Sequence, residues 1–100
     1  MTNTARGEAK IELGGETFTC CASLGALARV EGRLGKPLPL VLEELMQGSY
    51  GASLAILEET AIEGREKIAD LIAGPVEIAE AAAKVFEASG LLGGKAKPGK

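Results

Sequence analysis

The sequence predicts an α+β domain that is mainly α, with an N-terminal β-hairpin followed by four to five short helices. Residues 10–21 alternate apolar and polar side chains around a Gly-Gly pair, which is typical of a hairpin. Beyond them, apolar residues recur at helical spacing between glycines and prolines. Only 3% of the residues are aromatic, so the core must be aliphatic. We expect one domain over residues 9–92, with a disordered N-terminus (1–8) and a flexible basic tail (93–100).

The hairpin pattern predicts its own register. If Gly14 and Gly15 form a two-residue turn, Leu13 faces Glu16 and Ile11 faces Phe18. One face then carries Ile11, Leu13, Glu16, Phe18 and Cys20, and it is apolar except for the glutamate beside the turn. The other face, with Lys10, Glu12, Thr17, Thr19 and Cys21, is expected to lie in water. A lone hairpin is unstable, so helices must cover the apolar face.

The first predicted helix covers residues 24–34. Ser23 is a suitable N-cap, Gly35 a suitable residue just past the C-terminus, and Pro37 prevents continuation. Gly25 and Gly32 mark either close packing or surface sites, and the sequence does not choose. Its apolar positions are Leu24, Leu27, Val30 (or Glu31) and Leu34.

The second helix is predicted over 38–47. Its stripe has the spacing i, i+3, i+4, i+7, i+8, and the pair Glu43-Glu44 falls on the opposite side. Gly48 ends the helix. The stripe consists of Leu38, Val41, Leu42, Leu45 and Met46.

Three further helices are predicted over 51–63, 65–73 and 75–89. Ser49 or Ser53 caps the first, in which Ile56 and Ile62 lie off the main stripe and indicate either wider burial or an exposed apolar edge. Gly74-Pro75 separates the second from the third. The inward residues predicted for the last two helices are Ile68, Leu71, Ile72, Val76, Ile78, Ala82, Val85 and Phe86.

Charge and hydropathy argue against several classes of protein. Formal net charge is −3, and residues 95–100 carry three lysines and no acid, so the rest of the chain sums to −6. This balance argues against nucleic-acid binding and against a DNA-binding regulatory or antitoxin-like domain. No apolar run is long enough to cross a membrane, and the N-terminus has no apolar signal core, so a cytoplasmic protein is expected.

Residues suited to catalysis are missing or badly placed. The chain has no histidine. Neighbouring acids such as Glu58 and Glu59 do not face each other on a helix, and the serines sit where helices begin or end. Cys20 and Cys21 are interpreted as reduced thiols, because a disulfide between neighbours is strained and no zinc set completes them. No enzyme activity, cofactor, metal or catalytic residue is predicted.

The string IELGGETFTCCASLGALARVEGRLGKPL, residues 11–38, resembles the N-terminal block of a family from bacterial gene transfer agents and tailed prophages. In that family two short strands around a glycine-rich turn lead into a helix of the type SLGALAxxExxxGKxL. Later features also fit: the LxxLMxG pattern at residues 42–48 and an alanine-rich last helix after Gly-Pro. The match covers about residues 9–92. The matching helix residues are Ser23, Leu24, Gly25, Ala26, Leu27, Ala28, Glu31, Gly35, Lys36 and Leu38.

The resemblance implies a tail assembly chaperone. Such a protein binds the long helical tape measure protein in the bacterial cytoplasm and keeps it soluble. The chaperone helps tail tube protein polymerise around the tape measure protein, and the chaperone is absent from the finished particle. The family has also been described as a tail tube component, so a structural tail subunit is the alternative. The resemblance implies no catalytic residues.

A chaperone for an amphipathic helix needs exposed apolar surface, and the chain has more apolar helical positions than a core of this size needs. We predict an exposed partner-binding strip of Leu42, Met46, Tyr50 and Ile56, in which methionine suits an adaptable surface. The alternative for each residue is a place in the core. Self-association into a homo-oligomer is a further expectation.

Overall fold

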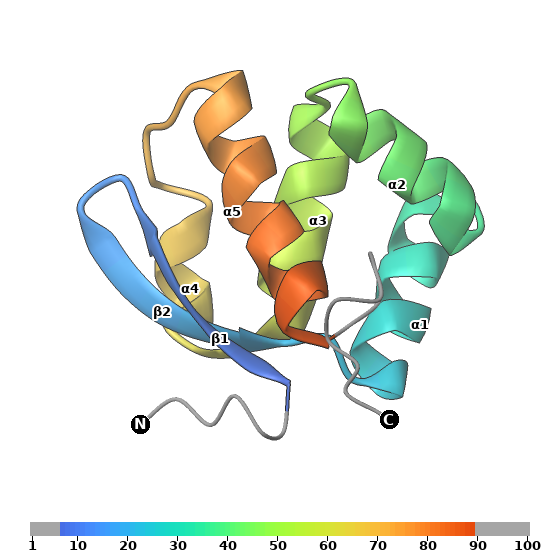
Figure 1. Ribbon diagram of the computed structural model, residues 1–100, viewed down its shortest axis with the longest axis horizontal. Helices are drawn as coiled ribbons and strands as arrows, with labels where there is room; N and C mark the ends of the chain where they lie inside the picture. Colours follow the sequence, from blue (N-terminus) through green and yellow to red (C-terminus); the bar gives the residue numbers. More distant parts are fainter. Residues whose placement is uncertain (1–6, 90–100) are drawn as a thin grey trace.

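The computed structural model describes residues 7–89, and residues 1–6 and 90–100 lie outside that range. A β-hairpin comes first, and helices make up most of the remaining described chain (Figure 1), which confirms the predicted fold class. The predicted flexible tail, 93–100, lies outside the described residues. In chain order the elements are β1 (Glu8–Leu13), β2 (Glu16–Cys21), α1 (Leu24–Leu34), α2 (Leu38–Met46), α3 (Tyr50–Thr60), β3 (Ala61–Glu63), α4 (Arg65–Ile68) and α5 (Pro75–Ser89).

The hairpin has the predicted register. Leu13 pairs with Glu16 and Ile11 with Phe18. The turn residues Gly14 and Gly15 have φ values of 59° and 84°, which side chains other than glycine rarely adopt. The antiparallel pairing continues to the far end of the hairpin, where Glu8 pairs with Cys21. Glu8 is therefore part of β1, although it falls in the stretch 1–8 predicted to be disordered.

The two faces of the hairpin differ as the alternation predicts, with one exception. Ile11, Phe18 and Cys20 are buried, whereas Glu16 beside the turn is exposed. Thr19 belongs to the face expected in water, but it is buried. It lies where β3 joins the outer edge of β2 and the register of that pairing is irregular. This third strand, which gives the sheet order β1-β2-β3, pairs with β2 at Thr19 and was not predicted.

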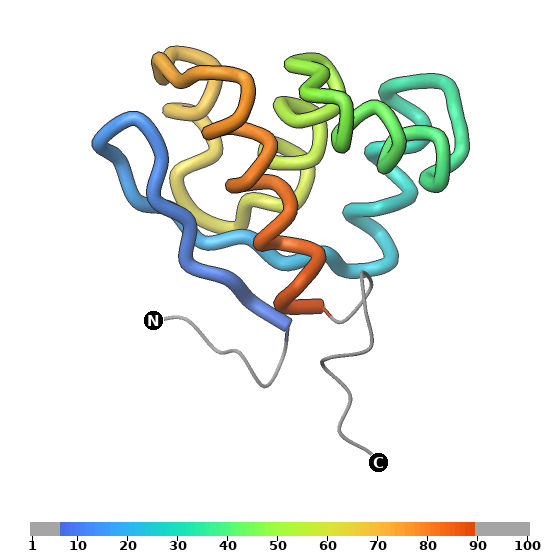
Figure 2. The backbone as a smooth tube through the Cα atoms, turned by 45° about the horizontal axis from the view of Figure 1, so that its top comes forward, coloured from blue at the N-terminus to red at the C-terminus, as the bar shows by residue number. Residues whose placement is uncertain are grey.

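The helices lie on one side of the sheet, with α3 at their centre. α3 packs against α1, α2, α4 and α5 and touches β2. α5 lies beside α3 and runs along β1, so the last described helix covers the first strand (Figures 1 and 2). Because α3 has neighbours on most sides, it is buried on most of its surface. Its buried residues are Ala52, Ser53, Ala55, Ile56, Leu57 and Thr60.

The ends of α1 and the start of α3 lie at the capping residues that the sequence predicts. Ser23 accepts a hydrogen bond from the backbone N–H of Ala26, and Gly35 takes a left-handed conformation just after α1. Of the two candidate caps for α3, Ser49 is the one used, because its hydroxyl accepts from the N–H of Ala52. A side chain at Gly32 would meet nothing within 4 Å, so this glycine occupies a surface site.

The predicted helix over 51–63 is three residues too long at its C-terminal end. α3 ends at Thr60, and residues 61–63 form β3. The Thr60 hydroxyl donates to the Ile56 carbonyl at 2.6 Å, and Gly64 adopts φ 81°, which turns the chain. Pairing with β2 satisfies backbone groups that one more helical turn would have satisfied internally.

The predicted helix over 65–73 is also too long. α4 ends at Ile68, and the chain continues to α5 without regular structure. Ile68 is buried as predicted and Leu71 packs against the core, but Ile72 is 90% exposed. Once the helix has ended, its periodicity no longer determines which side chains point inward, so the prediction for Ile72 is wrong.

Candidate partner-binding groove

The predicted strip of four residues is only partly a surface. Met46 is 81% exposed and Tyr50 is 52% exposed, while Leu42 is half-buried. Ile56 is completely buried, so its placement on an exposed strip is wrong. The reason is the central position of α3, since a helix packed on several sides buries residues away from its main apolar stripe.

Leu42 and Met46 line one groove of about 380 Å³ between α2 and α5. α2 supplies its larger apolar side chains, and α5 supplies alanines. Because the alanine side chains of α5 are short, they do not fill the space between this helix and Met46. The lining residues are Pro39, Leu42, Glu43, Leu45, Met46, Ala79 and Ala83.

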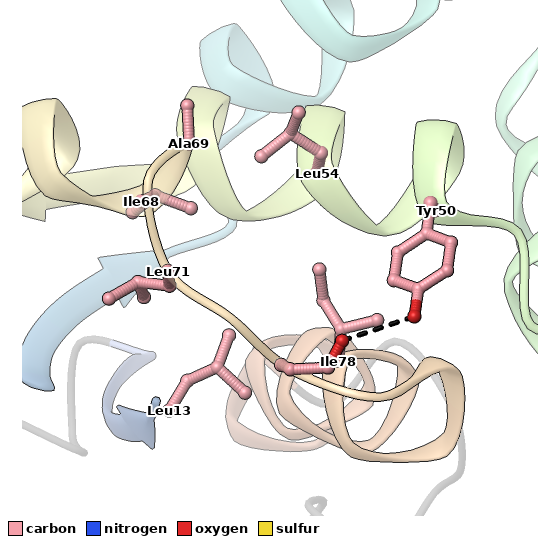
Figure 3. A pocket seen from close by; sticks show the side chains of 8 residues that line it. Leu13, Tyr50, Leu54, Ile68, Ala69, Leu71 and Ile78 are labelled. Atoms are coloured by element: carbon pink, nitrogen blue, oxygen red, sulfur yellow. Dashed lines mark hydrogen bonds between the residues drawn. The ribbon is translucent and has the colours of Figure 1, made fainter. Parts of the chain in front are cut away.

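Tyr50 belongs to a different place. Its hydroxyl donates a hydrogen bond to the Ala73 carbonyl at 3.1 Å, which ties α3 to the segment between α4 and α5 (Figure 3). Its ring borders an apolar cavity of about 120 Å³, and Leu13, Leu54 and Ile78 are among the other residues that line this cavity. Tyr50 therefore lines this cavity and is not among the residues that line the groove containing Met46.

Val76, a residue of α5 outside the groove lining, was predicted to face the core. Its side chain is mostly exposed, so that prediction is wrong. It lies three residues before Ala79, and residues three apart are neighbours on a helix surface. The signal was present in the sequence, because Val76 is two residues from Ile78 and thus on nearly the opposite side of the helix.

A cluster of ion pairs around Glu59 lies away from the groove lining. The Glu59 carboxylate, on α3, contacts Arg29 at 3.3 Å, Arg33 at 3.3 Å and Arg65 at 3.5 Å. Arg29 and Arg33 belong to α1, so this cluster fastens α1 to the end of α3. The groove walls are thus set by packing of α2 and α5, and this ionic cluster serves the fold.

The described residues also show what the fold offers for chemistry. Within 7–89 no three His, Cys, Asp or Glu side chains lie close enough to hold a metal ion. No helix in this range is long and apolar enough to cross a membrane. Cys20 and Cys21 are not joined in a disulfide; Cys20 is buried and Cys21 is half-buried.

The Cys20 thiol is buried and donates weakly to the Leu57 carbonyl at 3.8 Å. Burial raises its pKa from the ordinary 9.0 to about 11, and a hydrogen bond with Thr60 opposes this in part. Nucleophilic attack requires the thiolate, so this environment makes Cys20 a packing residue and not a reactive one.

The raised pKa of Cys20 predicts a loss of stability in alkali. Between about pH 9 and pH 11 the unfolded chain releases the thiol proton while the folded chain keeps it. The free energy of unfolding should therefore fall as pH rises, with a slope of up to about 1.4 kcal/mol per pH unit from this group. Urea unfolding from pH 8.5 to 10.5 measures the slope.

Cys20→Ala is the control, because it removes this thiol and leaves every other side chain in place. The variant should lose stability uniformly and show the shallower pH dependence. Parallel curves for the two proteins would contradict the assignment.

Comparison with protein-family models, with curated proteins and with solved structures gives no match.

Proposed function

We propose that this protein is a tail assembly chaperone of a gene transfer agent or tailed prophage, which binds the tape measure protein during tail assembly in the bacterial cytoplasm. The observation that carries the proposal is the open apolar groove between α2 and α5, with Met46 81% exposed at its wall. The family resemblance of residues 9–92 supplies the identity of the partner. The protein acts by binding, without catalysis and without a cofactor.

The groove suits such a partner. A tape measure protein is long and helical, and helices present apolar stripes that lie in hydrophobic grooves. Leu42 and Leu45 provide an aliphatic floor, and Met46 adds an unbranched side chain that adapts to different contacts. Covering the apolar stripe of the partner while the tail tube forms would keep the partner soluble.

A structural tail subunit is supported less well. Tail tubes polymerise through extended β-structure, and here the sheet consists of two six-residue strands and one of three residues. Most of the described chain is helical. The geometry thus favours transient binding over a place in the tube.

Co-expression with the tape measure protein from the same gene cluster tests the proposal. We expect a soluble complex on affinity capture of this chain, with the tape measure protein insoluble when expressed alone. Failure to form that complex would overturn the proposal. Recovery with tube protein and in purified particles would instead establish the structural subunit.

A further inference from the structure

The floor of the groove determines the shape of what it binds. α2 has nine residues, which corresponds to about 13 Å of helix. Alongside it, Val76, Ala79 and Ala83 form one line on the surface of α5 because they are spaced by three and four residues. Two nearly continuous apolar walls of this length match at most about two and a half turns of a third helix with an apolar stripe.

The rim of the groove carries negative charge. Glu43 lines the groove directly. Glu80 is three residues before Ala83 and Glu87 four residues after it, so both flank this wall residue on the surface of α5, and both are exposed. Among residues 7–89, none of these three glutamates forms an ion pair.

Positive charge near the groove does not balance the rim. α2 contains no basic residue, and the nearby Lys36 is paired with Glu44. α5 contains one, Lys84, which lies four residues after Glu80 and three before Glu87 and is therefore a neighbour of both on the helix surface, although among residues 7–89 it forms no ion pair. The partner thus meets an apolar floor beside which three carboxylates outnumber one lysine, so the charge of the described rim is negative.

We propose that the groove between α2 and α5 selects an amphipathic α-helix whose apolar stripe is flanked by lysine or arginine. The proposal rests on the proposed function and names the segment type that the chaperone recognises. Apolar burial supplies most of the affinity, and pairing with Glu43, Glu80 and Glu87 selects the sign of the flanking charges. A helix of the same apolar stripe with acidic flanks is repelled.

Two synthetic 18-residue helical peptides test the charge selection. They share one apolar stripe of leucines and carry either lysines or glutamates on both flanks. We expect the lysine peptide to bind at least tenfold more tightly by fluorescence anisotropy in 0.05 M salt. The advantage should shrink toward 0.5 M salt, because screening shortens the range of the charges. Equal affinities at low salt would overturn the charge selection.

Charge-swap variants give the matching control on the protein. Replacing the rim carboxylates (Glu43→Lys with Glu80→Lys) should reverse the preference, so that the glutamate peptide binds better. Both positions are exposed, and the fold should be unaffected. An unchanged preference would show that the peptides bind elsewhere.

Met46→Glu tests the groove itself, and Leu24→Glu is its matched control. Both side chains are more than four-fifths exposed, at 81% and 88%, but Leu24 lies at the start of α1, outside the groove lining. We expect Met46→Glu to weaken lysine-peptide binding at least tenfold with an unchanged melting temperature, and Leu24→Glu to leave binding intact. Normal binding by Met46→Glu would place the site elsewhere.

The same variants distinguish failure of the groove from failure of the chaperone function. If the Met46→Glu variant still forms the complex with the tape measure protein, the proposed chaperone function is supported and the groove is rejected as the binding site. If the protein binds the lysine peptide selectively but forms no complex with the tape measure protein, the groove is supported as a binding site and the chaperone function is rejected. If sedimentation shows a wild-type dimer that Met46→Glu dissociates, the groove is occupied by a second copy of this chain, and the proposal is wrong.

Discussion

Replacing Phe86 by alanine is expected to lower the free energy of unfolding by about 3–5 kcal/mol. Phe86 is fully buried in α5 and is the largest of the fully buried side chains. Its helix packs against both β1 and α3, so the cavity would open between layers that cannot both move inward. Small domains have only about 5–15 kcal/mol of stability, so this variant should unfold at much lower denaturant concentration.

Urea unfolding followed by circular dichroism measures the effect, with Val76→Ala as the control on the same helix. Val76 is mostly exposed, and its loss should change the free energy of unfolding by less than about 0.5 kcal/mol. If Phe86→Ala does not fold, Phe86→Leu should still do so, with a loss on the order of 1 kcal/mol. Equal stabilities of Phe86→Ala and Val76→Ala would contradict the described core.

Gly64→Ala is expected to cost roughly 2–4 kcal/mol, from two causes. Gly64 has φ 81°, a left-handed conformation in which a β-carbon is strained. That β-carbon would also lie 2.9 Å from the β-carbon of Phe18. Phe18 is buried in β2, which is paired on both sides, so it cannot retreat without disturbing the sheet.

Gly32→Ala makes the same chemical change at a site with neither problem. Gly32 lies within α1, and an added β-carbon would meet nothing within 4 Å. We expect it to raise stability by about 0.5–1 kcal/mol, because alanine favours helix more than glycine does. Thermal and urea unfolding of the two variants should shift in opposite directions, and a shift in the same direction would contradict the conformation of Gly64.

Elements with local signals were predicted from the sequence. The hairpin has an alternating pattern and two glycines with positive φ, and α1 has a serine cap and Gly35 at its end. β3 has no comparable signal. Its three residues form a strand only because the edge of β2, some forty positions away, pairs with them. The same long-range contact ends α3 early, so neither boundary could be read from local periodicity.

The groove was predicted only in part, for a related reason. A stripe of apolar residues predicts one buried side, but it does not show how many neighbours a helix has. Met46 lies at the edge of the α2 stripe and is exposed, whereas Ile56 lies off the α3 stripe and is buried because α3 is central. The α5 wall depends on a pairing of helices that the sequence did not reveal.

The position of α5 along β1 has a consequence for synthesis on the ribosome. The hairpin is complete at Cys21, but the helix that covers β1 ends at Ser89, 68 residues later. At about 5–20 residues per second, this separation takes roughly 3–14 s. For that time the side chains of Ile11 and Leu13 lack their final cover, so the hairpin cannot be stably folded on the nascent chain before α5 has emerged.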